Sequence, residues 1–170
     1  GTRENGLNAI DLHANKVLQY TATEYPEFKS NGLRYMNTYN NKLYIGTENG
    51  MYEAKLLSNE KLKLVKLFPT GNNETKMNAY KSIKSFYKDY KNRFWLCTDG
   101  AGIVLLNEKF DVLVTFNTSN YLNNNVVYGI VPQNDTTFWI SSNAGLSKIT
   151  WKENELSQKN IINAHHYDEN

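Results

Sequence analysis

The pattern of hydrophobic and polar positions repeats three times along the chain. Each copy has an apolar, an aromatic, an aliphatic, a small, a hydroxyl and a polar residue, then a glycine turn and further aliphatic residues. The copies lie at 43–51, 94–103 and 138–146. Tyr44 and Trp95 are 51 residues apart, and Trp95 and Trp139 are 44 apart. A period of roughly 40–50 residues is that of a four-stranded propeller blade, so the spacing predicts a repeated β unit.

The second copy shows how one unit divides into strands. Turn signals and enrichment in β-branched and aromatic residues predict strands at 82–88, 93–98, 103–107 and 110–117. The second of these strands is apolar at nearly every position, as is typical of a strand that is covered on both faces. Neighbouring blades provide such covers in a propeller.

The same pattern divides the whole chain into blades. We predict an all-β fold and a single partial domain over 1–170, a β-propeller fragment of about three and a half four-stranded antiparallel blades. Its parts are a partial blade at 6–22 and blades at 33–68, 80–117 and 126–162. The partial blade has the pattern of the last two strands of a unit. Periodicity is weak from Glu153 onward, so the end of the last blade stays open.

Composition and charge narrow the classes of partner. Of 170 residues, 40% are hydrophobic and 13% aromatic, which excludes a disordered chain. There are 19 Lys and Arg against 17 Asp and Glu, and the basic residues are dispersed, so we expect no nucleic-acid partner. The longest apolar runs, such as 102–106, are much shorter than the roughly 18 residues of a membrane-spanning helix. We therefore expect no membrane contact within this segment.

Two segments carry a resemblance to a known family. Residues 86–103 join an acidic turn to an aromatic-aliphatic-small-Thr strand and a glycine turn, and residues 123–147 repeat this pattern after an Asn-rich entry. The pattern resembles the two-component regulator propeller repeat. The copy at 43–51 is a weaker match, because Tyr44 stands in place of Trp and the strand before it lacks the acidic turn.

The resemblance implies a function as well as a fold. In that family such repeats form extracytoplasmic propellers of hybrid histidine kinase/response regulators, best known in gut Bacteroidetes, where they sense glycan breakdown products. It implies a periplasmic segment of an inner-membrane receptor, an oligosaccharide ligand, and a histidine kinase elsewhere in the polypeptide, with no catalysis in this segment. Two alternatives stay open: a propeller enzyme such as a lyase or glycosidase, and a protein-interaction platform.

Candidate ligand-binding residues lie on one predicted face of the propeller. The loops between second and third strands share that face, and loops on a rigid scaffold often carry binding residues. The candidates on these loops and on the crossing between blades are Glu48, Asn49, Asp99, Asn143, Tyr121 and Asn124. We interpret Trp95 and Trp139 as core residues rather than sugar-stacking residues, because they lie in nearly continuous apolar strands.

The sequence shows no catalytic signature. Cys97 occupies the repeat position of Gly46 and Ser141, which admits only small side chains, so we interpret it as a packed structural residue and not a nucleophile. A hydroxyl residue precedes each glycine turn, where it can bond the turn's backbone. These residues are Thr47, Thr98 and Ser142.

One short tract near the C-terminus offers metal-ligating atoms. It contains His165, His166, Asp168 and Glu169, while His13 is distant. Adjacent residues of an extended chain point to opposite sides, and the spacing matches no zinc pattern. We interpret the tract as a surface tail and expect no metal and no cofactor.

The uncovered ends of a partial ring predict self-association. A closed propeller has about 4–8 blades, so a fragment exposes apolar sheet faces of the kind that mark interaction sites. We expect two copies to associate through these ends, with one copy lending the inner two strands to the partial blade of the other.

Overall fold

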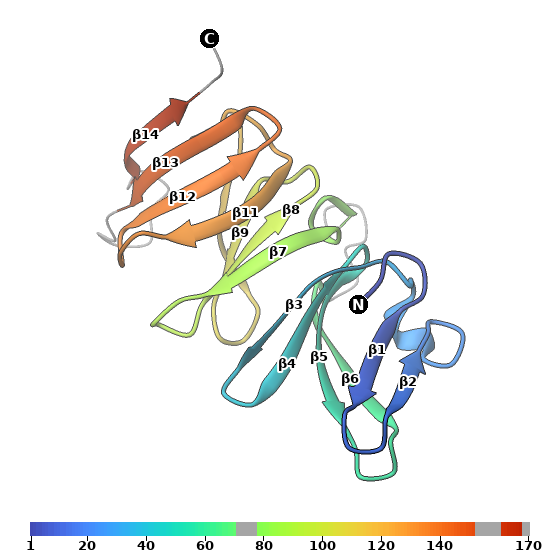
Figure 1. The fold of residues 1–170 in the computed structure, drawn as a ribbon. Coiled ribbons are helices and arrows are strands. Elements are labelled where there is room, and N and C mark those ends of the chain that lie inside the picture. The colour runs from blue at the N-terminus through green and yellow to red at the C-terminus, as the bar shows by residue number, and fades with distance from the viewer. Residues whose placement is uncertain (71–77, 152–160, 168–170) are drawn as a thin grey trace. The chain divides into compact units, whose positions relative to one another are not determined.

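The structure, a computed structural model, describes residues 1–70, 78–151 and 161–167, and they form an all-β propeller fragment (Figure 1). The described strands make one two-stranded and three four-stranded antiparallel sheets. The chain divides into two compact units, Gly1–Ile83 and Lys84–Asn170, and each is described by itself. The unit boundary falls just after the first residue of β7 (Ile83–Lys88), whose sheet belongs to the second unit.

The first unit contains a hairpin and a four-stranded meander. The hairpin is β1 (Leu7–Asp11) and β2 (Lys16–Tyr20), and the meander is β3 (Leu33–Tyr39), β4 (Lys42–Thr47), β5 (Gly50–Leu56) and β6 (Leu62–Phe68). Two 3-10 turns also occur, η1 (Pro26–Phe28) and η2 (Asn78–Tyr80). Leu7 and Tyr20 of the hairpin share one buried hydrophobic cluster with Ile45 and Tyr52 of the meander. This cluster holds the hairpin against the meander.

The second unit contains two four-stranded meanders. The first is β7, β8 (Phe94–Thr98), β9 (Ile103–Leu106) and β10 (Val112–Phe116), and the second is β11 (Val127–Pro132), β12 (Thr137–Ser142), β13 (Gly145–Trp151) and β14 (Ile161–Tyr167). The strands predicted between 82 and 117 agree with β7 to β10 to within two residues at each end. Every residue of β8 is buried, which confirms that this strand is covered on both faces.

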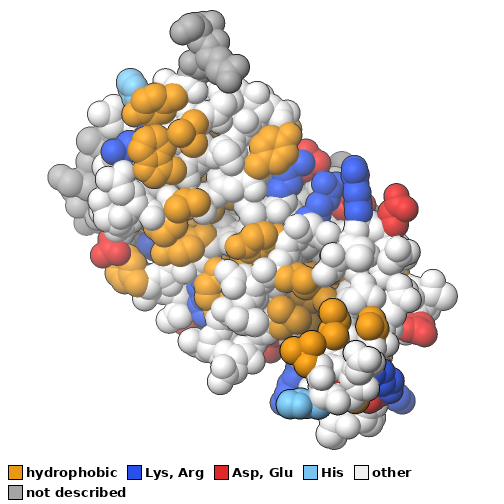
Figure 2. Space-filling model, viewed as in Figure 1, with side chains coloured by type: hydrophobic (Ala, Val, Ile, Leu, Met, Phe, Trp, Pro, Cys, Tyr) orange, Lys and Arg blue, Asp and Glu red, His pale blue; other side chains and the backbone are white. Residues whose placement is uncertain are grey.

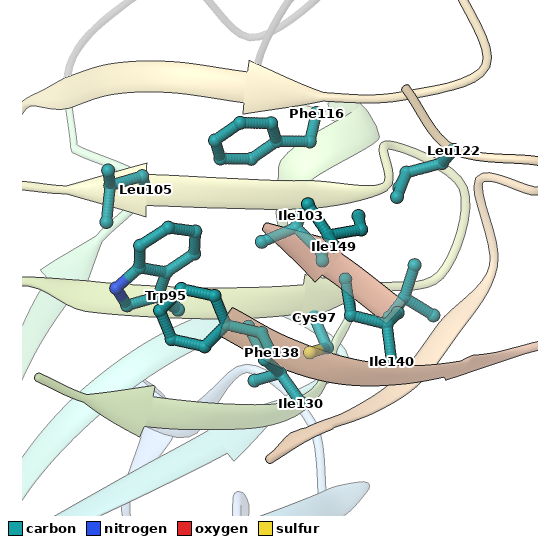
Figure 3. Packing of buried hydrophobic residues seen from close by; sticks show 11 residues of the cluster. Trp95, Cys97, Ile103, Leu105, Phe116, Leu122, Ile130, Phe138, Ile140 and Ile149 are labelled. Carbon is teal, nitrogen blue, oxygen red and sulfur yellow. The ribbon is translucent and has the colours of Figure 1, made fainter. Parts of the chain in front are cut away.

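Trp95 lies at the centre of the core between these two sheets (Figure 3). Its ring centroid is 4.6 Å from that of Phe138, 5.1 Å from that of Trp151 and 5.6 Å from that of Phe116. Cys97 lies on the same face of β8 and is fully buried. Both residues are therefore structural, as predicted.

The core role predicted for Trp139 is wrong. Trp139 alternates with the buried Phe138 and Ile140, so it lies on the opposite face of β12 and is only half-buried. Its indole Nε1 donates to Gln133 Oε1 at 3.1 Å in an exposed hydrogen bond, and its ring packs beside Tyr167. No sheet among the described residues of the second unit covers this face. Burial of the repeated aromatic residue thus depends on a neighbouring sheet.

The hydroxyl residue before each glycine turn bonds the turn, as predicted. Thr98 Oγ1 donates to the carbonyl of Gly102 at 2.8 Å and accepts from the Ala101 amide at 3.0 Å. Thr47 Oγ1 likewise donates to the carbonyl of Gly50 and accepts from the amide of Asn49, and Ser142 makes longer bonds of this kind. Gly102 has a φ of +80°, and a Cβ there would collide with the Phe116 carbonyl oxygen. The turn therefore requires glycine at this position.

The C-terminal tract is a strand, which corrects its interpretation as a tail. Residues 161–167 form β14 and pair with β13, which places Ser147 opposite His166 and Lys148 opposite His165. His166 Nδ1 lies 2.8 Å from Ser147 Oγ. Asp168 and Glu169 lie outside the described residues. The two histidines are exposed on a sheet edge, with their side chains on opposite faces.

Candidate functional site

Each four-stranded sheet carries one polar pair at the same end, and we call these three the rim pairs. One partner is the second residue of the first strand, and the other directly follows the hydroxyl residue that ends the second strand. Arg34 Nη2 lies 2.7 Å from Glu48 Oε1, Lys84 Nζ lies 3.4 Å from Asp99 Oδ2, and Tyr128 Oη donates to Asn143 Oδ1 at 2.6 Å. The chemistry differs among the blades although the position is the same.

A β-bulge sets the direction of two of these side chains. The pairing of β3 with β4 shifts between Leu33 and Tyr35, and that of β11 with β12 shifts between Val127 and Gly129. Arg34 and Tyr128 are the extra residues at these shifts. A bulge bends its strand and re-aims a side chain, and bulges are common next to binding sites. The bulges thus set the geometry of the Arg34 and Tyr128 rim pairs.

Two rim pairs meet in the second unit and form one group, the Lys84 cluster, which consists of Lys84, Asp99, Tyr128 and Asn143. Lys84 Nζ lies 4.7 Å from the centroid of the Tyr128 ring, within the range of a cation–π interaction. Ser85 Oγ donates to the Tyr128 carbonyl at 2.7 Å, and Asp99 forms a β-bridge with Val126. These two contacts link the β7–β10 sheet to the β11–β14 sheet at the Lys84 cluster.

Exposure differs strongly within the Lys84 cluster. The Lys84 side chain is 13% exposed and that of Asp99 is 36% exposed, whereas Tyr128 is 50% exposed. Tyr128 is therefore a large aromatic residue on the surface that contacts a largely buried lysine. A phenol, an ammonium, a carboxylate and an amide together offer both donors and acceptors beside an apolar ring. This set suits an uncharged polyhydroxylated ligand.

The structure brings together only some of the six ligand-binding candidates that were predicted from the sequence. Asp99 and Asn143 join in the Lys84 cluster, and Glu48 lies in the equivalent pair of the first unit. Asn49 Nδ2 donates to the Lys29 carbonyl at 3.4 Å. Asn49 thus has a local structural partner.

Tyr121 and Asn124 lie apart from the Lys84 cluster contacts. Asn124 Oδ1 accepts from the Val126 amide at 2.8 Å and closes a turn. The Tyr121 ring packs 6.1 Å from that of Phe116 and lines a shallow polar groove of about 370 Å³ that also includes Asn120 and His166. We treat this groove as separate from the cluster.

Sequence reasoning missed Lys84 and Tyr128, the strand partners of Asp99 and Asn143. A signal was present, because a polar or amphipathic residue follows the first apolar residue of each inner strand: Leu33-Arg34, Ile83-Lys84 and Val127-Tyr128. In the structure, the apolar residue pairs with the hydroxyl residue that ends the next strand, as Leu33 does with Thr47 and Val127 with Ser142. This pairing places the residue after the apolar one beside the residue after the hydroxyl one.

Within the described ranges, no group of three or more His, Cys, Asp or Glu side chains is placed so that it could hold a metal ion. In the same part of the chain, no helix has the length and apolar character needed to cross a membrane.

Comparison with known proteins supports the fold. No protein-family model matches the sequence, and no curated protein is similar to it. The structure is similar to PorZ, a bacterial surface component of the type-IX secretion system of Porphyromonas gingivalis, with a TM-score of 0.56 and 17% identity over 82% of this chain and 18% of that chain. It is also similar to an extracellular domain described as that of a hybrid two-component system of B. thetaiotaomicron, with a TM-score of 0.51 and 17% identity over 97% of this chain and 26% of that chain.

These similarities show a shared fold. The chain spans 18% and 26% of the two neighbours, so it matches only a part of each. One of the two is an extracellular domain of the sensor class that the sequence pattern resembles, which agrees with the expected propeller architecture.

Proposed function

We propose that this chain is a non-catalytic, ligand-sensing segment of the extracytoplasmic part of a hybrid two-component sensor, and that it binds a glycan-derived oligosaccharide at the Lys84 cluster. A histidine kinase elsewhere in the polypeptide would receive the signal, and the segment would lie in the periplasm as part of an inner-membrane receptor. The family resemblance and the fold similarity to a sensor's extracellular domain support the sensor role. The chemistry of the cluster supports the choice of ligand.

The observation that carries the proposal is the half-exposed Tyr128 ring in its polar frame. A tyrosine offers an apolar face together with a hydroxyl, which suits a ligand with alternating C–H and O–H surfaces. Asp99 and Asn143 supply acceptors within the same cluster, and Lys84 supplies donors. The hydrogen bond to Asn143 and the contact with Lys84 hold the Tyr128 ring in place, so little side-chain entropy is lost when a ligand binds.

The cluster does not have the composition of a glycosidase site. Most glycosidases use two carboxyl groups, one on each side of the scissile bond, at separations of roughly 5–9.5 Å. The Lys84 cluster contains one carboxylate, Asp99, and it is paired with a lysine. Binding without turnover is therefore the expected behaviour.

The test is calorimetric titration of the whole chain with a panel of neutral and acidic oligosaccharides, alongside product analysis for hydrolysis or elimination. We expect saturable binding of at least one neutral oligosaccharide, without turnover. Tyr128→Ala should weaken it roughly tenfold or more, which corresponds to the loss of about 1.4 kcal/mol.

Tyr90→Ala is the matched control. Tyr90 is a 62% exposed tyrosine with the Lys91 ammonium 5.8 Å from its ring centroid, in the turn between β7 and β8. Its substitution should leave the affinity unchanged. An equal effect of both substitutions would remove the cluster as the site, lack of binding across the panel would remove the oligosaccharide, and turnover would favour a propeller enzyme.

A further inference from the structure

The hairpin of β1 and β2 has the structure of the outer half of a blade. Thr2 Oγ1 donates to the Gly6 carbonyl at 3.2 Å and accepts from the Asn5 amide at 2.8 Å. Thr98 makes the equivalent bonds to residues at the same sequence separations in the second unit. The turn that leads into β1 is therefore structurally equivalent to the turn that leads from β8 into β9.

The glycines that follow confirm this equivalence. Gly6 has a φ of +72° and Gly102 a φ of +80°. A Cβ at Gly6 would collide with the Tyr20 carbonyl oxygen, and one at Gly102 would collide with that of Phe116. By position, β1 corresponds to β9, and β2 corresponds to β10.

One edge of β1 has no partner strand within the described residues. β9 lies between β10 and β8, whereas β1 pairs only with β2 in its two-stranded sheet. An unpaired edge offers a row of backbone donors and acceptors to an additional strand. The repeat defines the place of that strand as the position of β8.

A cleft of about 850 Å³ lies in the first unit beside β1, between the hairpin and the β3–β6 sheet. Its lining includes Leu7 and Ala9 of the hairpin, together with Met36 and Leu56 of the sheet. Met36 is 36% exposed and Leu56 is 49% exposed. Figure 2 shows hydrophobic side chains on the visible face over β1 and the neighbouring strands of this sheet.

The cleft corresponds to the place that Trp95 fills in the second unit. The Trp95 ring packs against Phe116, Phe138 and Trp151. The residues at the same repeat positions in the first unit are Tyr20, Leu43 and Leu56, and all three line the cleft. The lining is thus the counterpart of the pocket that holds a buried tryptophan.

From this correspondence we propose that the cleft is a docking groove for a two-stranded β-hairpin of the same repeat type. One strand of such a hairpin would pair with the free edge of β1, at the position of β8, and place a large aromatic side chain between Tyr20, Leu43 and Leu56. Addition of a strand to a sheet edge supplies main-chain hydrogen bonds, and the pocket supplies specificity. This inference concerns the first unit and is independent of the oligosaccharide proposal.

A second copy of this chain is a poorer occupant for the groove. The matching hairpins of this chain are β3–β4, β7–β8 and β11–β12, and each carries a core residue that is at most 3% exposed: Ile45, Trp95 and Phe138. Each hairpin can be donated only if the donor loses a part of its own core. The occupant is therefore a hairpin outside the described strands, with an aromatic residue at the Trp95 position.

The test uses a labelled hairpin peptide with the sequence of residues 83–98, cyclised between its ends and carrying Cys97→Ser to avoid oxidation. Fluorescence anisotropy against the whole chain should show saturable binding. A second peptide with Trp95→Ala should bind at least about tenfold more weakly. Failure of the first peptide to bind, or equal binding of the two, would overturn the proposal.

Two variants of the protein complete the test. Leu56→Lys places a charge in the cleft and should weaken peptide binding about tenfold or more. Val65→Lys is the matched control, because Val65 lies on β6 outside the cleft and is 46% exposed against 49% for Leu56. Equal effects would overturn the proposal. Self-association of the chain alone that only Leu56→Lys abolishes would assign the groove to a second copy and also overturn it.

Discussion

The indole of Trp95 donates a hydrogen bond of 3.0 Å from Nε1 to the Asp89 carboxylate oxygen Oδ2. The same oxygen accepts from Arg93 Nε at 2.7 Å, and the Asp89 and Arg93 side chains are only 4% and 10% exposed. The Arg93 guanidinium also lies 5.0 Å from the Trp151 ring centroid. The acidic turn of the repeat therefore orients the buried tryptophan of the next strand and joins it to the neighbouring sheet.

Substitution of Asp89 should lower the free energy of unfolding, and the loss should be larger when the buried Arg93 and Trp95 donors are left without an acceptor. Asp89→Ala should lower the free energy of unfolding by about 3–5 kcal/mol, because it leaves the Arg93 charge buried without its carboxylate. Asp89→Asn keeps an acceptor and should cost less. Gln133→Ala is the control, since it removes the equivalent but exposed bond to Trp139, and a change within about 0.5 kcal/mol is expected. Denaturant unfolding measures all three, and equal losses for Asp89→Ala and Gln133→Ala would contradict the argument.

The two repeated tryptophans should differ in their contribution to stability. Trp95→Ala removes the centre of a core and should cost roughly 3–5 kcal/mol. Trp139→Ala removes a half-buried ring on a face that no described sheet of the second unit covers, and it should cost less than about 1 kcal/mol, in line with surface substitutions. Thermal unfolding of the two variants gives the comparison. A similar fall in melting temperature for both would mean that the outer face of β12 is covered in solution.

The strands could be predicted from the sequence because their determinants are local. The apolar run 94–98 and the turns on both sides of it define β8 without knowledge of the rest of the chain. The burial of Trp139 could not be predicted in this way. It occupies the same repeat position as Trp95, and only the presence of a neighbouring sheet distinguishes the two environments.

The candidate site depended on register, which the sequence pattern does not contain. Asp99 and Asn143 could be proposed from their loops, but their strand partners Lys84 and Tyr128 could not. The bulge that directs Tyr128 arises where the pairing of β11 with β12 shifts, and this is a property of two strands together. The cleft beside β1 likewise requires the packing of two sheets.

The size of the side chain at position 97 should be tightly limited. Cys97 is fully buried in the core around Trp95, so Cys97→Leu should overpack that core and cost about 1–3 kcal/mol. Cys97→Ser is close in volume and should be milder. Equilibrium unfolding of the two variants tests this difference. The native thiol should react with a thiol reagent only as the protein unfolds, and rapid labelling without denaturant would contradict the packing.

Stability at alkaline pH should decline because of two buried acids. Burial raises the pKa of the Cys97 thiol from 9.0 to about 12, and burial also raises the pKa of the Tyr52 hydroxyl from 10.0 to about 12. Between the unfolded pKa and the folded pKa, both groups keep their protons in the folded state and lose them in the unfolded state. Their contribution to the free energy of unfolding is therefore complete below pH 9 and falls as the pH rises toward 12. A difference of one pKa unit between the two states corresponds to about 1.4 kcal/mol once the pH has passed both values. Cys97→Ser has no ionisable group at this position, so its unfolding free energy should decline less steeply than that of the wild type above pH 9. Urea unfolding at several pH values measures both slopes, and identical slopes would show that the Cys97 thiol ionises as easily in the folded protein as in the unfolded chain.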